Sequence, residues 1–236
     1  MVLGSPVGAV VAATDPSATR AFLTSLGAVT DRSRGLVDVV PGEGSWSREA
    51  MAGGPAALDF YARSVATMPH VTVSLGPLVM HQARVTGPDG LPVVLIDANH
   101  RRPSLLDTTD LPVSEAHSMV WVVPSVEETL AFLTAAGLSL VFDAPIASDE
   151  VCSLVGLPPG TPVRMAMVSD EALTPMRLEL LEAPGVSPWD GVVRAGMVWP
   201  LFRSSAVDLP WLSVTEVAPG VHRCVAPGGL LVELRG

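Results

Sequence analysis

Glu179 and Glu233 are the residues of this chain whose type and setting suit acid–base chemistry. Each lies in a short apolar segment that alternates as a β-strand does, so side chains two residues apart share a face. Arg177 should therefore accompany Glu179, and Arg235 should accompany Glu233. In an apolar cavity the pKa of a carboxylate rises through desolvation unless a cation compensates, and a raised pKa suits a general acid or base. Both glutamates are candidates for moving a proton.

The chain repeats itself, and the repeat indicates how these glutamates are positioned. The sequence Ala-Phe-Leu-Thr at 21–24 recurs at 131–134, and Gly27 and Gly137 follow it at the same offset of 110 residues. Later in each copy, a Pro-x-Gly turn precedes an apolar segment, at 88–95 and again at 227–234. These matches predict a duplication of one unit of roughly a hundred residues.

Each copy begins with a strand followed by a helix. In the first, Val7–Ala13 is an apolar strand, and Asp15 caps a helix from Pro16 to Leu26 that stops at Gly27. In the second, Met119–Val123 is the strand. Ser125-Val126-Glu127-Glu128 then reads as a capping box for a helix that runs to Gly137.

Extended segments follow each helix, bounded by turn residues. The remaining strands are predicted at 36–40, 58–63, 71–75, 81–86, 93–96, 140–142, 163–168, 177–181, 197–202, 214–217, 221–225 and 231–234. Residues 101–115, with two prolines and several Asp, Ser and Thr, form the natural linker between residues 1–100 and 116–236.

Composition excludes several classes of function. The chain has 236 residues, of which 48% are hydrophobic, and its formal net charge of −10 argues against a nucleic-acid partner. All fourteen cations are arginines, so neither a Schiff-base lysine nor a P-loop lysine exists. No apolar segment is long enough to span a membrane. Cys152 and Cys224 do not form a disulfide framework, and we expect reduced thiols in a cytoplasmic protein.

The order of strand, helix and three strands resembles the βαβββ module of the vicinal oxygen chelate superfamily, which includes glyoxalases, extradiol dioxygenases and drug-binding resistance proteins. The resemblance rests on residues 15–22 and 125–132 before the two glycine-ended helices, and on Arg177-Leu178-Glu179-Leu180-Leu181-Glu182 as a last strand. It implies an α+β fold of four modules, beginning near Val7, Pro55, His117 and Arg194. The helices should be truncated in the second and fourth modules. Each half should curl a mixed sheet around a cleft.

The resemblance also implies where a metal ion would bind. In the family, ligands come from the first strand of a module and from the glutamate of its last strand. The matching positions here are Gly8, Ala57, Val94, Ser118, Glu179, Met197 and Glu233. Two carboxylates remain without a histidine, so we predict no bound metal and no cofactor. His117 stands next to one such position, and only a β-bulge would turn it into the cleft.

If Ser118, Met197 and the two glutamates share the C-terminal cleft, alternation places mainly apolar neighbours around them. We expect Glu179 and Glu233 to be catalytic. The residues expected to bind substrate are Ser118, Arg177, Met197, Trp199, Leu201 and Arg235. The opposite interpretation remains open for each: the glutamates could be neutralised by arginines or backbone amides, and Trp199 could be a core residue.

We therefore predict a metal-independent isomerase, cyclase or dehydratase for a hydrophobic, oxygen-bearing metabolite of secondary metabolism, with Arg177, Arg235 or Ser118 stabilising an oxyanion. Asp59 and Tyr61 would share the first-half cleft. One alternative is a binding protein that sequesters a hydrophobic drug or pathway product. Another is a metal-dependent glyoxalase or dioxygenase that uses His117. The expected partner is a small hydrophobic ligand, and the protein could be a monomer or a homodimer.

Overall fold

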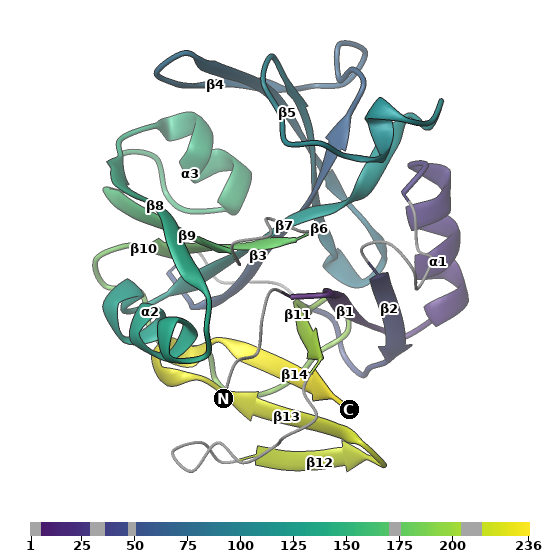
Figure 1. The fold of residues 1–236 in the computed structure, drawn as a ribbon, viewed down its shortest axis with the longest axis vertical. Coiled ribbons are helices and arrows are strands. Elements are labelled where there is room, and N and C mark those ends of the chain that lie inside the picture. The colour runs from purple at the N-terminus through teal and green to yellow at the C-terminus, as the bar shows by residue number, and fades with distance from the viewer. Residues whose placement is uncertain (1–5, 29–35, 47–50, 170–175, 204–213) are drawn as a thin grey trace.

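The structure is a computed structural model that describes residues 6–28, 36–46, 51–169, 176–203 and 214–236. Two curved sheets pack against each other (Figure 1). The smaller has six strands in the order β12 (Val214–Ala218), β13 (Val221–Val225), β14 (Leu231–Arg235), β11 (Val198–Arg203), β1 (Gly8–Ala13) and β2 (Leu36–Pro41). The larger has eight in the order β4 (Val71–Leu75), β5 (Leu78–Thr86), β6 (Pro92–Ala98), β3 (Gly54–Ala62), β7 (Val113–Val123), β10 (Arg177–Glu182), β9 (Val163–Ser169) and β8 (Ser139–Ile146).

Both sheets are mixed, as the α+β fold class predicts. In the six-stranded sheet, β1 runs parallel to β2 and antiparallel to β11. In the eight-stranded sheet, β3 runs parallel to β6 and antiparallel to β7. The four module starts are confirmed, since β1, β3, β7 and β11 begin close to the predicted residues.

The expectation that each half of the chain forms its own sheet is wrong. The six-stranded sheet combines the first module with the fourth, and the eight-stranded sheet combines the second with the third. Each sheet therefore contains strands from both sides of the segment 101–115, so this segment separates the two repeats in sequence but not in space. The linker is also shorter than predicted, because β7 already begins at Val113. It contains one 3₁₀ turn, Leu105–Asp107.

The two predicted helices are confirmed, and their ends follow from local capping. Asp15 accepts hydrogen bonds from the N–H groups of Ser17 and Ala18 at the start of α1 (Pro16–Ser25). Ser125 accepts one from the N–H of Glu128 at the start of α2 (Val126–Ala135). A glycine with positive φ follows each helix.

A third helix, α3 (Asp149–Val155), was not predicted. It has seven residues, begins at the cap Ser148 and ends at Gly156, whose φ is 68°. Four of its side chains are buried: Val151, Cys152, Leu154 and Val155. Packing rather than intrinsic propensity stabilises such a short helix. It lies between the β4–β5 hairpin and β8 (Figure 1).

The second module has no helix between β3 and β4, in line with the predicted truncation. The matching segment of the fourth module is 204–213, which lies outside the described residues. None of the three α-helices in the described ranges has the length and apolar character needed to span a bilayer.

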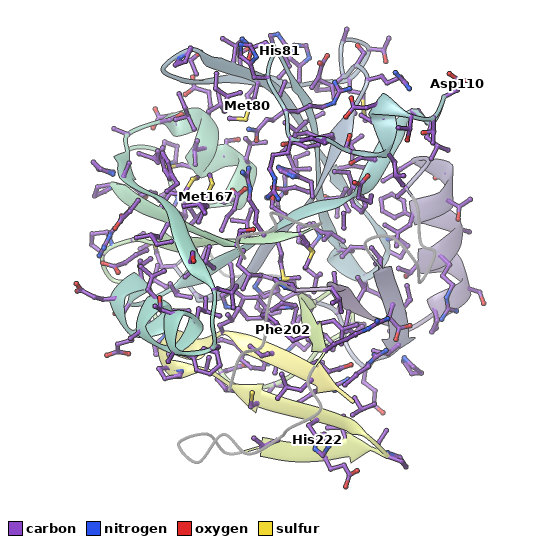
Figure 2. All side chains as sticks on the ribbon, viewed as in Figure 1. Met80, His81, Asp110, Met167, Phe202 and His222 are labelled. Carbon is purple, nitrogen blue, oxygen red and sulfur yellow. The ribbon has the colours of Figure 1, made fainter. Side chains whose placement is uncertain are left out.

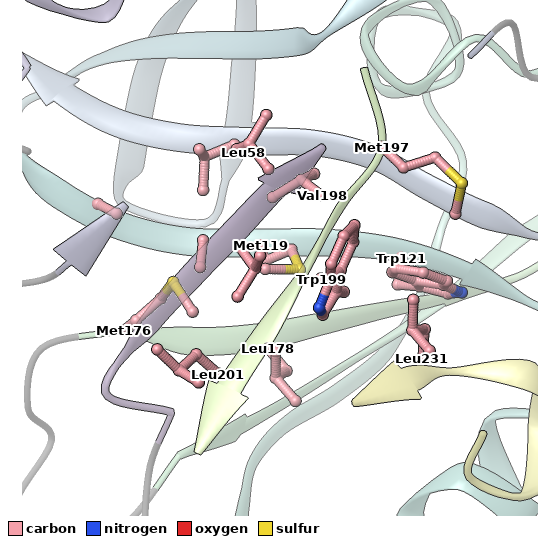
Figure 3. Close-up of a cluster of buried hydrophobic side chains, with 14 of the residues drawn as sticks. Leu58, Met119, Trp121, Met176, Leu178, Met197, Val198, Trp199, Leu201 and Leu231 are labelled. Atoms are coloured by element: carbon pink, nitrogen blue, oxygen red, sulfur yellow. The ribbon is translucent and has the colours of Figure 1, made fainter. Parts of the chain in front are cut away.

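The main core lies between the two sheets (Figure 3). β1, β2 and β11 contact β3 and β7 across this layer. A second apolar cluster covers the other face of the eight-stranded sheet and includes the buried residues of α3. The central strands β3 and β7 are consequently buried on both faces, which explains the apolar sequence of β3 apart from Asp59 and the apolar run Met119–Val123 in β7.

Candidate active site

A cavity of about 390 Å³ lies on the face of the eight-stranded sheet that carries α3. This is within the size range of sites for small organic ligands. Most of its lining is apolar and comes from β3 to β10 and α3. Met80 on β5 and Met167 on β9 both line it and lie close to α3 (Figure 2). Its polar lining consists of Asp59, Gln82, Arg102, Arg177 and Glu179.

Strand pairing brings these polar residues together at one end. Asp59 on β3 pairs with Val94 on β6 and with Ser118 on β7. Ser118 pairs in turn with Arg177 on β10. Positions from both repeats, Ala57 and Val94 in one and Glu179 in the other, therefore face a single cavity, because the second and third modules share a sheet.

Arg177 connects two side chains at this end. Its Nε donates a hydrogen bond to Glu179 Oε1 at 3.1 Å, and the pair is largely buried, with side-chain exposures of 20% and 8%. Its Nη2 lies 3.1 Å from His117 Nε2. A guanidinium only donates hydrogen bonds, so His117 Nε2 is the acceptor and carries no proton.

His117 reaches this position through a bulge in β7. Asp59 pairs with Ser118 while the next residue, Phe60, pairs with Ala116, so His117 is an extra residue in the ladder. Its ring stacks on Tyr61 with centroids 3.9 Å apart. Burial lowers the pKa of His117 well below its ordinary value, and the nearby charges of Arg177 and Arg102 lower it further. His117 is therefore neutral at physiological pH.

Asp59 is a second buried carboxyl group at this end, with 4% of its surface exposed. Its Oδ2 accepts a hydrogen bond from Ser118 Oγ at 2.8 Å, and its Oδ1 has no hydrogen-bond partner among the described residues. Burial raises the pKa of Asp59 well above its ordinary value, and the charge of Glu179 raises it further. The hydrogen bond from Ser118 and the charge of Arg177 oppose this shift but do not outweigh it.

Tyr61 lies next to the polar end through its stacking on His117, although it does not line the cavity. Its hydroxyl oxygen accepts a hydrogen bond from the backbone N–H of Arg102 at 3.3 Å. Burial is the main cause of a raised pKa for this hydroxyl, so the phenol keeps its proton. Tyr61 and Asp59 follow Ala57 at intervals of two residues along β3. This spacing is the one feature of the sequence that predicts a shared face for the three side chains.

The structure does not bring Glu233 to Glu179, because β14 belongs to the six-stranded sheet. Glu233 is fully buried, and both of its oxygens are engaged. Oε1 accepts from Arg235 Nη2 at 2.6 Å, and Oε2 accepts from Arg223 Nε at 2.8 Å and from Trp199 Nε1 at 3.3 Å. Arg235 also pairs with Asp38 at 2.6 Å. This network accounts for the carboxylate structurally, as the alternative interpretation allows.

The other predicted substrate-binding residues are also placed elsewhere. Met197, Trp199 and Leu201 are at most 2% exposed and belong to the core around Trp121 and Met119 (Figure 3). They and Arg235 do not line the described cavity. The prediction placed all four in one cleft with Glu179 because it assumed that consecutive modules of the second half share a sheet. Of the predicted site residues, Glu179 and Arg177 line the cavity. Ser118 does not line it, but it donates a hydrogen bond to Asp59, which does.

A divalent metal ion does not fit this donor set. An ion between Glu179 and His117 would occupy the place of the Arg177 guanidinium, which bonds to both. Within the described ranges, no group of three or more His, Cys, Asp or Glu side chains is arranged to hold a metal. The Arg177 guanidinium is a fixed cation already paired with Glu179, so it takes the role that a metal ion would have there.

No family model matches the sequence, and comparison with curated proteins finds no match. Among solved structures, glyoxalase I from Zea mays is similar, with a TM-score of 0.64 and 16% identity over 98% of this chain and 92% of that one. A point mutant of the same enzyme gives a TM-score of 0.65 at 17% identity with the same coverage. A provisionally assigned dioxygenase from Bacillus subtilis gives 0.59 at 12% identity, over 98% of this chain and 86% of its own. These likenesses and the two module-paired sheets show that the chain has the fold of the vicinal oxygen chelate superfamily.

Proposed function

We propose that the protein is a metal-independent enzyme that moves a proton on a hydrophobic, oxygen-bearing small molecule bound in the cavity of the eight-stranded sheet. The observation that carries the proposal is the pair of unlike carboxyl groups at one end of an apolar cavity. Burial raises the pKa of Asp59 well above its ordinary value, while the Glu179 carboxylate is paired with Arg177. Two carboxyl groups that differ in protonation state can serve as acid and base in one reaction.

In this reaction Glu179 is the base. A C–H bond next to the substrate carbonyl breaks, its proton passes to a Glu179 oxygen, and its electron pair moves onto the carbonyl oxygen as an enolate forms. Return of the proton to the same carbon gives hydrogen exchange. Where a C=C bond is conjugated with the enolate, return of the proton to the far carbon of the dienolate shifts the double bond and completes an isomerisation. Arg177 is a positioning residue, because its bond to Oε1 fixes the glutamate.

The test is exchange of the α-hydrogens of aromatic and alicyclic ketones in D₂O, followed by ¹H NMR. Wild-type protein should accelerate exchange of at least one ketone above the buffer rate. Glu179→Gln should slow it by roughly a hundredfold or more, the usual contribution of a general base. Glu233→Gln, at a carboxylate outside the cavity, is the matched control. Unchanged exchange in Glu179→Gln would remove the proposed mechanism.

A second candidate function is sequestration of a hydrophobic compound without conversion. The predominantly apolar lining favours it, since binding alone needs neither acid nor base. Stoichiometric ketone binding with no α-exchange above the buffer rate would support this alternative instead of the enzyme.

A further inference from the structure

We infer that Asp59 holds the carbonyl oxygen of the ligand, and that the cavity accordingly takes an uncharged aromatic or alicyclic ketone or aldehyde. This inference deepens the proposed function, because it uses the same cavity and assigns the group that stabilises the enolate oxygen. The predicted oxyanion partners are Arg177, Arg235 and Ser118. Arg235 lies in the six-stranded sheet, and Ser118 donates its proton to Asp59. Arg177 uses two of its five N–H donors on Glu179 and His117, so it can assist but leaves the unpartnered Asp59 oxygen unexplained.

The unpartnered oxygen of Asp59 is the first observation. Asp59 lines the cavity and is 4% exposed, yet its Oδ1 has no hydrogen-bond partner among the described residues. Buried polar atoms in folded proteins are nearly always hydrogen-bonded, so an exception in a cavity wall points to a partner supplied by a ligand. The ligand must therefore bring a polar atom to this end of the cavity.

Whether Asp59 Oδ1 donates to the ligand or accepts from it is indicated by the hydrogen bond that Oδ2 already makes. Oδ2 accepts the hydroxyl proton of Ser118, so Oδ1 is the oxygen that is free to carry an acid proton and to donate it in a hydrogen bond. The raised pKa of Asp59 agrees with a protonated carboxyl group. A protonated Oδ1 donates, so the matching ligand atom is an acceptor such as a carbonyl oxygen. The charged groups that act on Asp59 are Glu179 and Arg177, and Arg177 in turn acts on His117 and Tyr61.

The rest of the lining defines the body of the ligand. Away from the polar end, the walls come from α3 through Val151 and Leu154, from β5 through Met80, and from β9 through Met165 and Met167. Thioether side chains adapt to irregular apolar shapes and contact aromatic rings favourably. A ring system fits this wall, with its carbonyl directed to Asp59.

The same contact would serve catalysis. When Glu179 removes a proton, negative charge develops on the carbonyl oxygen, and a donor in a buried site stabilises that charge far more than water-exposed donors do. A neutral carboxyl group is suited to this task because it donates a hydrogen bond without bringing a negative charge near the enolate.

The first measurement compares acetophenone with ethylbenzene, which has the same ring and nearly the same shape but no oxygen. Wild-type protein should bind acetophenone about fivefold more tightly, the value of one net hydrogen bond. Asp59→Leu should remove this preference, and Asp59→Asn should retain it because the amide still donates. Asp97→Asn, at a carboxyl on β6 outside the cavity lining, should behave as wild type.

The second measurement reads the contact directly from acetophenone labelled with ¹³C at the carbonyl carbon. The bound resonance should lie downfield in wild type and in Asp59→Asn relative to Asp59→Leu, since hydrogen bonding deshields a carbonyl carbon. A merely structural role for Asp59 would leave the shift unchanged. Equal shifts in wild type and Asp59→Leu, equal binding of the two compounds, or no binding of either would each overturn the inference.

These outcomes separate the inference from the proposed function. The ketone preference depends on Asp59 and should persist in Glu179→Gln, whereas α-exchange depends on Glu179. Loss of exchange in Glu179→Gln with no ketone preference would refute the Asp59 assignment alone. A clear preference with exchange unaffected by Glu179→Gln would refute the proposed base alone.

Discussion

Arg177 Nη2 donates a hydrogen bond to His117 Nε2 over 3.1 Å, so the imidazole nitrogen nearest the polar end of the cavity is committed to a cation of the protein itself. The same guanidinium binds Glu179 at 3.1 Å. A side chain that carries a permanent charge thus occupies the space between an imidazole and a carboxylate. This arrangement explains why a bulge that turns His117 toward the cleft does not create a metal site.

Removal of the Arg177 guanidinium should lower the unfolding free energy of the protein. Arg177→Met leaves Glu179 as an uncompensated buried carboxylate and should cost about 3 kcal/mol of unfolding free energy. Adding Glu179→Gln should recover much of the loss, because the buried charge is then gone. Denaturant unfolding of both single variants and the double variant measures the coupling. As control, Arg164→Met breaks the more exposed pair with Asp143 and should cost less than about 1 kcal/mol. Additive effects of Arg177→Met and Glu179→Gln would contradict the pairing.

Asp59 should make the protein less stable as the pH rises. Because its folded pKa is raised above the ordinary value of 3.8, the folded state binds more protons than the unfolded state above that pH. Unfolding free energy should therefore fall between pH 3.8 and the folded pKa, by up to about 1.4 kcal/mol per pH unit. Asp59→Asn should flatten this part of the profile in urea unfolding across pH. An identical slope in wild type and variant would show that Asp59 ionises normally.

His117 should act in the opposite direction. Its folded pKa lies well below the ordinary value of 6.5, so the folded state binds fewer protons than the unfolded state once the pH falls below 6.5. Stability is lost as the pH drops from 6.5 toward the lowered folded pKa. His117→Gln keeps an acceptor for Arg177 but does not titrate, and it should reduce this loss. His222→Gln on β13 is the control, and it should leave the profile as in wild type. A wild-type profile in His117→Gln would refute the assignment.

Glu233 should prove structural. Glu233→Gln removes the fully buried negative charge that the partly exposed Arg223 and Arg235 share, and it should lower the unfolding free energy by roughly 2–4 kcal/mol. Acetophenone binding should remain at the wild-type level, because Glu233 lies in the other sheet. Calorimetric titration of folded variant protein checks this. Weaker ketone binding by the variant would restore Glu233 to the site.

Filling the cavity should abolish binding without disturbing the polar groups. Ala57 is buried, lines the cavity and precedes Asp59 on the same face of β3. Ala57→Leu adds three carbon atoms to that space and should weaken acetophenone and ethylbenzene binding by roughly tenfold or more through overlap. Ala144→Leu on β8, at a residue outside the lining, is the volume-matched control. Unchanged binding in Ala57→Leu would place the ligand elsewhere.

Local elements of the fold could be predicted from the sequence. The caps Asp15 and Ser125, the glycines that end α1 and α2, and the alternation in β10 and β14 are each decided within a few residues of chain. The helix α3 escaped prediction because its seven residues are stabilised by burial of one face. The repeat predicted a duplication of one unit, and the resemblance to a known family implied four modules and their fold.

For the site, the sequence by itself determined which side chains were candidates for chemistry: it singled out Glu179 and Glu233 with their neighbouring arginines and Ser118, and strand alternation linked Asp59 and Tyr61 to Ala57. Only the tertiary structure decided which of them meet. Pairing of β3 with β7 and of β1 with β11 joins modules far apart in the chain, so Asp59 lies beside Glu179 while Glu233 lies in the other sheet. The β7 bulge, which turns His117 to Arg177, is likewise set by pairing with β3. Local sequence cannot specify such contacts, because the register between distant strands depends on how their apolar faces pack across the whole core.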